Sequence, residues 1–202
     1  MQVIAVLSRA CLCDTLTRLK ECLLSNPPLS EFDAAIMVSL CCYAGPRVIM
    51  IERSLDPRDP WAGDMAFPGG HREPSDSSPL DTALREAYEE TCLEPSSFEI
   101  LGFLPAASPK RITVRVVPVV SVLRTRHCPV ETLRQCSSEE TRRLTLVPLP
   151  FRVEKRLLMH RFRGTLVEGY KTWYGDVIWG MSLRVLEELV ERLRRCNIEY
   201  VI

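Results

Sequence analysis

Apolar positions divide the chain into segments that carry the repeat patterns of strands and helices. Residues 34–43 and 47–53 are apolar runs that favour β-structure, and the Ala-Gly-Pro sequence at 44–46 between them predicts a turn. Further runs predict strands at 98–104, 112–123, 144–149 and 157–162, the last two more weakly. In the run 112–123, Pro118 indicates an edge or a bulge, because proline cannot donate a ladder hydrogen bond.

Leucines at helical spacing predict a helix near each end of the chain. Residues 14–25 place Leu16, Leu19 and Leu23 on one face after the capping candidates Asp14 and Thr15. From residue 182 onward, apolar residues form one stripe beside a charged surface, namely Leu186, Leu189, Val190 and Leu193. The order of the segments predicts an α+β domain rather than a regular βαβ winding.

Composition limits the classes of protein that fit. The chain has 202 residues, 46% apolar content and a formal net charge of +0, which suits a single soluble domain. Without a net charge, the protein as a whole has no electrostatic attraction to nucleic acid or membranes. The start of the chain has no basic region typical of a signal peptide, so we expect a cytoplasmic protein. The nine cysteines form no secreted disulfide framework, which favours structural thiols, and an intracellular disulfide of the thermophile kind stays open.

A third helix is predicted after the polar loop that follows Gly69 and Gly70. Ser78 suits the N-cap, Pro79 the first helical position and Asp81 a capping box. Spacing then predicts an apolar side made of Leu80, Ala83, Leu84, Ala87, Tyr88 and Thr91. On the opposite side it predicts a cluster of three acids, Glu86, Glu89 and Glu90. Such a cluster fits either a solvated face or a site for Mg²⁺ or Mn²⁺.

The loop and this helix resemble the Nudix box, whose pattern is G, five residues, E, seven residues and R-E-U-x-E-E-x-G-U. Gly70 matches the first glycine, residues 85–90 match R-E-U-x-E-E, and Leu93 matches the last aliphatic position. The chain departs from the pattern in that Asp76 stands at the first glutamate, eight residues separate it from Arg85, and Cys92 replaces the last glycine.

Segments outside the box resemble the coenzyme A diphosphatase branch of this superfamily. These are "IERS" at 51–54, "GDMAFPGG" at 63–70 and "VIWGMSLRVLEEL" at 177–189, and the one-residue expansion of the box is similar to that branch as well. Where that branch has a histidine and a glutamine, this chain has Trp61 and Asp64, which leaves coenzyme A itself open. If Asp64 faced the ligand, its charge would repel an extra ribose phosphate.

The resemblance implies an α/β/α sandwich with a mixed sheet over residues 30–202, and we expect residues 1–29 to form a helical segment packed on it. It also implies metal-dependent hydrolysis of a diphosphate linkage in a nucleoside diphosphate derivative. The alternatives are an ADP-sugar or dinucleotide diphosphatase and a non-catalytic nucleotide sensor. The implied partner is a small nucleotide rather than nucleic acid or membrane, and a homodimer is one candidate assembly.

The implied site has metal ligands, catalytic groups and substrate-binding groups. Glu86, Glu89 and Glu90 are the expected ligands of Mg²⁺ or Mn²⁺, although Glu89 could instead help to activate water. Arg85 can pair with Glu89 at i,i+4 and is expected to orient it. Asp76 or Glu140 is the expected general base. The expected catalytic residues are Arg85, Glu86, Glu89, Glu90 and Glu140. The expected substrate-binding residues are Arg53, Trp61, Gly69 and Gly70.

Overall fold

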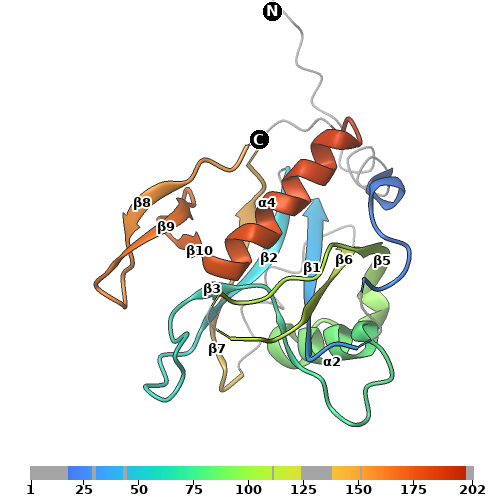
Figure 1. Ribbon diagram of the computed structural model, residues 1–202, viewed down its shortest axis with the longest axis horizontal. Coiled ribbons are helices and arrows are strands. Elements are labelled where there is room, and N and C mark those ends of the chain that lie inside the picture. The colour runs from blue at the N-terminus through green and yellow to red at the C-terminus, as the bar shows by residue number, and fades with distance from the viewer. Residues whose placement is uncertain are drawn as a thin grey trace, which may run out of the picture.

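A seven-stranded mixed sheet lies between the two long helices of the molecule (Figure 1). The computed structural model describes residues 18–28, 31–42, 45–110, 112–123, 138–150 and 152–198. The sheet contains β1 (Ala34–Cys42), β2 (Pro46–Arg53), β3 (Met65–Ala66), β4 (Gly69–His71), β5 (Phe98–Phe103), β6 (Val116–Leu123) and β7 (Thr141–Pro148). The helices are α2 (Pro79–Thr91) and α4 (Gly180–Arg195). The predicted α+β class, with helices on both faces of a mixed sheet, is therefore confirmed.

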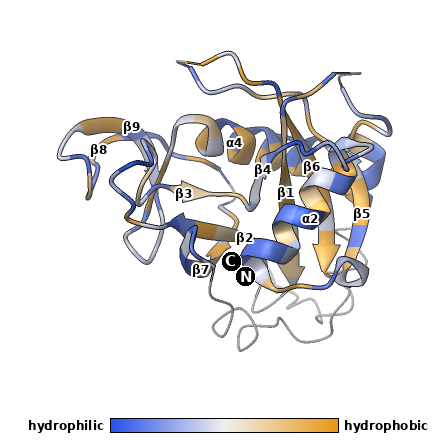
Figure 2. Ribbon diagram, turned by 90° about the horizontal axis from the view of Figure 1, so that it is seen from below, coloured by the Kyte–Doolittle hydropathy of each residue, from blue (hydrophilic) through white to orange (hydrophobic). Residues whose placement is uncertain are grey.

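Strand β1 is the centre of the sheet. It pairs in parallel with β6 and antiparallel with β2 and β4. Because side chains alternate along a strand, Ile36 and Val38 enter the core cluster under α4, whereas Ala35 and Met37 enter the cluster under α2. Figure 2 shows the matching pattern, with β1 and β6 mostly hydrophobic and α2 mixed. Burial on both faces explains why these strands appear in the sequence as continuous apolar runs.

A second sheet lies beside the start of α4 (Figure 1). It has the order β10 (Val177–Trp179), β9 (Leu166–Lys171) and β8 (Arg156–Met159), with antiparallel pairing throughout. Of these three strands the sequence predicted only β8, which overlaps the predicted run 157–162 at residues 157–159. Strand β9 was missed because Glu168 and Gly169 interrupt its short apolar pattern, and β10 was missed because three residues form a strand only through pairing, here with β9.

Helix α2 begins as the sequence predicted. The Ser78 Oγ accepts a hydrogen bond from the Asp81 N–H at 3.2 Å, and Pro79 is the first helical residue. At the other end, Cys92 takes the left-handed conformation, with a φ of 55°, that a glycine would adopt with less strain.

The predicted division of α2 into two faces is wrong for Tyr88 and Glu90. Tyr88, predicted on the apolar side, is 46% exposed, whereas Glu90, predicted on the opposite side, is only 3% exposed. The reason is helical geometry, since Glu90 follows Ala83 by seven residues and lies within about 20° of it around the axis. Glu90 therefore belongs to the face that packs on the sheet.

Two further expectations about local structure are corrected. The described part of the predicted helix 14–25 is a short 3-10 helix, η1 (Arg18–Cys22), and residues 14–17 lie outside the described residues. Another 3-10 helix, η2 (Pro95–Ser97), precedes β5.

Pro118 is neither at an edge nor at a bulge, because β6 lies between β1 and β5 and the shift in β5–β6 pairing falls between Ile100 and Gly102. Pro118 lies past the last β5–β6 pair, Phe103 with Val119, so its missing N–H leaves that ladder intact.

The N-terminal segment is tied to the end of α4 by a disulfide between Cys22 and Cys196. The Arg192 Nη1 also donates to the Cys22 carbonyl at 2.8 Å, and Leu24 forms an isolated bridge with Phe103. The expectation of reduced cysteines is thus wrong for this pair, whose 174-residue separation hides their proximity from the sequence. Cys92 is disulfide-bonded as well. In the described part of the chain, no helix has the length and apolar character that crossing a membrane requires.

Candidate active site

The glycine pair of β4 and the acids of α2 meet at close range. The Gly69 N–H donates to the Glu90 Oε2 at 2.9 Å. A Cβ at Gly70 would come within 2.4 Å of the Glu86 Oε1, and one at Gly69 would come within 2.4 Å of the Ala35 carbonyl oxygen. Glycine at position 69 is therefore required for β4 to lie against β1, and glycine at position 70 leaves the space that the Glu86 carboxylate occupies.

Glu90 is buried with part of its hydrogen-bonding capacity unused. Its Oε1 is buried and has no partner among the described residues. Burial, which disfavours the charged form, raises the pKa of the Glu90 carboxyl to about 8, although the bond from Gly69 opposes the shift. An unpartnered buried carboxylate oxygen is costly, so a ligand for this oxygen would stabilise the site.

Glu86 and Glu140 add negative charge around Glu90. Burial also raises the pKa of Glu86, and the charges of Glu89 and Glu140 act in the same direction against the lowering effect of Arg85. Glu140 is exposed and directly precedes β7, and its charge acts on both Glu86 and Glu90. The structure thus brings these three predicted site residues into one electrostatic environment.

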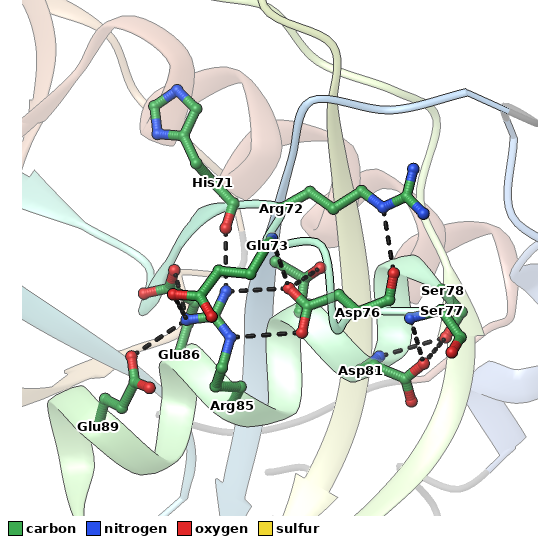
Figure 3. Close-up of polar contacts among 11 residues, drawn as sticks. His71, Arg72, Glu73, Asp76, Ser77, Ser78, Asp81, Arg85, Glu86 and Glu89 are labelled. Atoms are coloured by element: carbon green, nitrogen blue, oxygen red, sulfur yellow. Dashed lines mark hydrogen bonds and ion pairs between the residues drawn. The ribbon is translucent and has the colours of Figure 1, made fainter.

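Arg85 is the centre of a hydrogen-bonded network (Figure 3). Its guanidinium donates to Asp76, to the Glu86 Oε1 at 3.0 Å and to the Glu89 Oε2 at 3.1 Å. It also donates to the His71 carbonyl at 2.9 Å, while the His71 imidazole points away from the cluster in Figure 3. The predicted pairing of Arg85 with Glu89 is confirmed, and the network fixes the direction of the Glu86 carboxylate as well.

Asp76 anchors this network and does not have the environment of a general base. Its carboxylate is buried and accepts from Arg85, from the Thr82 hydroxyl at 2.9 Å and from the Glu73 N–H at 2.9 Å. The bonds from Arg85 lower the pKa of Asp76 to about 2. This environment favours Glu140 over Asp76 as the base, because the Asp76 oxygens are engaged and their basicity is low.

Of the two predicted substrate-binding side chains, Arg53 ends β2 and Trp61 lies in the loop between β2 and β3. Arg53 donates to the Asp59 Oδ2 at 2.7 Å, and the Trp61 N–H donates to the Asp59 Oδ1 at 2.9 Å. The charge of Arg53 also acts on Glu90. Trp61 is 40% exposed. Asp59, which holds both residues in place, was missed because acidic residues in a polar loop give no distinctive signal.

Asp64 does not face a ligand as a free charge. It is 7% exposed, and its carboxylate binds the His160 Nε2 at 3.0 Å and the Arg163 Nη2 at 2.9 Å. Burial lowers the pKa of His160, and its Nδ1 accepts from the Arg163 N–H at 3.3 Å, as a neutral imidazole can. Asp64 therefore lacks the free charge on which its expected repulsion of a ribose phosphate depends.

The acids at the glycine pair fit a divalent cation. Hard carboxylate oxygens are the ligands that Mg²⁺ and Mn²⁺ prefer, and the unpartnered Glu90 Oε1 lies in such surroundings. Within the described ranges, no group of three or more His, Cys, Asp or Glu side chains is already gathered as for a metal ion. The structure brings Glu86 and Glu90 to the glycine pair, whereas the Glu89 side chain is 53% exposed and turned toward Arg85.

Comparison with known proteins decides the family. The NUDIX domain matches residues 33–162, which include β4 and the whole of α2 and β7. The chain belongs to the Nudix family. A relative from Pectobacterium atrosepticum, described as an uncharacterized Nudix hydrolase NudL, is 32% identical over 171 residues, which cover 81% of this chain and 84% of the relative. The NudL of Escherichia coli K12 is 29% identical over 175 residues, with coverage of 82% and 85%.

Solved structures agree on the fold. The NUDIX domain of Shewanella oneidensis NrtR, solved with ADP-ribose, has a TM-score of 0.51 and 18% identity, covering 82% of this chain and 90% of that one. A MutT/nudix protein from Enterococcus faecalis has a TM-score of 0.50 and 18% identity, with coverage of 91% and 70%. The family match and the Nudix hydrolase relatives confirm that this chain is a Nudix hydrolase, an enzyme of pyrophosphate hydrolysis.

Proposed function

We propose that this Nudix hydrolase cleaves the diphosphate linkage of a nucleoside diphosphate derivative with the help of Mg²⁺ or Mn²⁺. The observation that carries the proposal is the meeting of Glu86 and Glu90 at the glycine pair, where the buried Glu90 Oε1 has no partner in the described chain. Glu86 and Glu90 would bind the cation, and Glu89 would be a further ligand or help to activate water. The bound cation would neutralise charge on the phosphate oxygens and lower the pKa of the attacking water.

The remaining roles follow from the contacts of each side chain. Arg85 orients Glu86 and Glu89 through its hydrogen bonds, while Asp76 holds Arg85. With Asp76 engaged in that way, Glu140 is the candidate base. It is exposed, and its charge already acts on Glu86 and Glu90.

Arg53 and Trp61 would contact the substrate beyond the linkage. Asp59 accepts hydrogen bonds from both residues, and the exposed Trp61 ring offers a surface for a nucleobase. Gly69 and Gly70 would let phosphate oxygens approach the backbone closely. Coenzyme A is a candidate substrate because the expanded box and the segments at 51–54 and 177–189 resemble the coenzyme A diphosphatase branch.

A substrate panel tests the proposal. The protein would be incubated with Mg²⁺ or Mn²⁺ and with coenzyme A, its 3′-dephospho form, ADP-ribose, NADH or a dinucleoside polyphosphate, and the products would be identified. ADP-ribose is included because the Shewanella NrtR domain was solved with it. We expect metal-dependent release of two phosphate-bearing products from at least one compound. Tight binding of a nucleotide without cleavage of any compound would instead support the sensor alternative.

A further inference from the structure

A cleft with excess positive charge lies on the face of the sheet opposite to the acids of α2. It has a volume of about 480 Å³ and is lined by Glu52, Arg142, Arg143, Arg161, Tyr174 and Asp176. An adjoining hollow of about 270 Å³ shares four of these residues and adds Lys171. Together the two volumes have the size of a small-molecule site.

A β-bulge directs two consecutive arginines into this cleft. Neighbouring residues of a regular strand point to opposite faces, but Glu52 pairs with Arg143 and Arg53 pairs with Thr141, so Arg142 is an extra residue without an opposite partner. As a result, Arg142 and Arg143 both reach the Glu52 carboxylate, at 2.5 and 2.9 Å. Bulges of this kind commonly redirect side chains next to active sites.

The cationic side chains of the cleft outnumber its carboxylates. Glu52 and Asp176 are the acids, and both are already paired with Arg142 or Arg143. Arg161 and Lys171 form no ion pair with any residue that the structure describes, and both are exposed. Arg161 and Arg142 instead lie 5.2 and 5.6 Å from the centre of the Phe162 ring. The cleft therefore favours an anionic ligand.

Two other groups favour a nucleoside over a simple anion. The Tyr174 ring is 62% exposed on the cleft wall, and its hydroxyl accepts from Arg47 at 3.3 Å, so it offers a planar surface for stacking. The Asp176 Oδ2 is buried and has no hydrogen-bond partner within the described ranges. This oxygen can accept a hydrogen bond from a ribose hydroxyl or a base amino group.

The cleft adjoins the acids of α2 around the end of β2 and the start of β7. Glu52 and Arg53 are neighbours on opposite faces of β2, and the charge of Arg53 acts on Glu90. Glu140, which also acts on Glu90, is two residues from Arg142, a span of at most about 7 Å between Cα atoms. A substrate with its diphosphate at the acids can thus reach the cleft with the adjacent nucleoside.

We propose that this cleft binds a nucleoside that carries a phosphomonoester, with Arg161 and Lys171 holding the phosphate and Tyr174 stacking on the base. The inference rests on the proposed function, because the cleft would bind the nucleoside of the same substrate whose diphosphate lies at the acids of α2. It implies a preference for nucleoside diphosphate derivatives that bear an additional phosphate on the nucleoside.

The test measures binding without catalysis. Adenosine 3′,5′-bisphosphate, 5′-AMP and inorganic phosphate would be titrated by calorimetry, at low salt and without metal, into the full chain carrying Glu90→Gln. We expect the bisphosphate to bind at least about tenfold more tightly than 5′-AMP, and Arg161→Gln with Lys171→Gln to abolish that advantage. Tyr174→Ala should weaken both nucleotides. Because no turnover is measured, failure here would leave the hydrolase proposal standing.

Arg156→Gln is the matched control, since Arg156 lies in the same small sheet, is exposed and does not line the cleft. It should keep the preference for the bisphosphate, and melting temperatures would verify that all variants fold. The proposal is overturned if the bisphosphate has no advantage, or if the advantage survives in the Arg161 and Lys171 double variant. It is also overturned if Arg156→Gln removes the advantage equally, or if inorganic phosphate binds as tightly as the bisphosphate.

Discussion

At the scale of single residues, the site depends on a carboxylate whose surroundings disfavour its charge. Glu90 is 3% exposed, and burial raises its pKa from the ordinary value of 4.5 to about 8. The folded metal-free protein thus binds this proton more tightly than the unfolded chain does. The resulting stabilisation is fully present below about pH 4.5 and is lost as the pH rises through about 8.

This linkage predicts a pH effect that Glu90→Gln removes. In chelator-treated protein, the melting temperature of the wild type should fall between pH 5 and 8 relative to that of Glu90→Gln, which cannot ionise at this position. Glu89→Gln is the control, because the Glu89 side chain is 53% exposed and should leave the pH profile unchanged. Parallel profiles of wild type and Glu90→Gln would show that Glu90 is ionised without penalty.

Asp76 is predicted to matter for stability and for the position of Arg85. Asp76→Asn removes the charge partner of a largely buried guanidinium, so we expect a loss of about 2 kcal/mol in the free energy of unfolding, measured with urea at neutral pH. Turnover should fall too, because Arg85 would no longer be held against Glu86. The pKa of Asp76 is lowered from 3.8 to about 2, so its contribution is present above about pH 3.8 and is lost as the pH falls through 2.

Glu73→Gln provides the comparison for Asp76→Asn. Glu73 also approaches Arg85, at 3.8 Å, but its side chain is 58% exposed, so its loss should change the unfolding free energy by less than about 0.5 kcal/mol. Equal effects of the two substitutions would mean that Asp76 is not the anchor of the network.

At the scale of elements, the contact between β4 and α2 sets the geometry of the acids. Gly70→Ala should reduce turnover and the affinity for Mg²⁺ by at least about tenfold, because its Cβ would meet the Glu86 carboxylate at 2.4 Å. The melting temperature should change little, since the clash is with a side-chain end rather than with the core. Metal affinity would be followed by calorimetry.

Gly164→Ala separates this clash from backbone strain. Its Cβ would meet open space, but its φ is +62°, so it should cost about 1 kcal/mol in stability and leave turnover unchanged. Normal metal affinity in Gly70→Ala would contradict the role that we give to the glycine pair.

The elements also show how far the sequence determines the structure. The regions of β1, β2, α2 and α4 were predicted because each carries a local repeat or cap that its own residues define. Strands β3 and β4 were missed because two or three residues form a strand only through their partners, here β2 and β1. The helical periodicity that predicted α2 also accounts for the burial of Glu90, but this residue was predicted on the wrong face.

Contacts distant in sequence were the other part that could not be predicted. Asp64 gave no sign of its partners His160 and Arg163, because nothing local indicates that the β8–β9 turn lies against the loop before β3. The acids, the arginine and the glycine pair were found through the Nudix resemblance, whereas Asp59 and the arginine cleft required the structure.

At the scale of the whole molecule, the disulfide between Cys22 and Cys196 joins segments that are 174 residues apart. A cross-link over such a loop restricts the unfolded chain, and removing it should lower the free energy of unfolding by about 2–4 kcal/mol. Cys22→Ser, Cys196→Ser and the double variant should all show this same loss with turnover unchanged. Losses that add up in the double variant would mean that the two cysteines act independently.

The central claim is that hydrolysis depends on a divalent cation held by the buried acids of α2. The most direct measurement is the initial rate of product release in saturating Mg²⁺, for wild type and Glu90→Gln, on the substrate that the panel identifies. We expect Glu90→Gln to lose about 100-fold or more in rate, because a neutral amide of similar volume removes one charged ligand. Its melting temperature at neutral pH should be equal or higher. Near-normal turnover by a folded Glu90→Gln protein would contradict the claim.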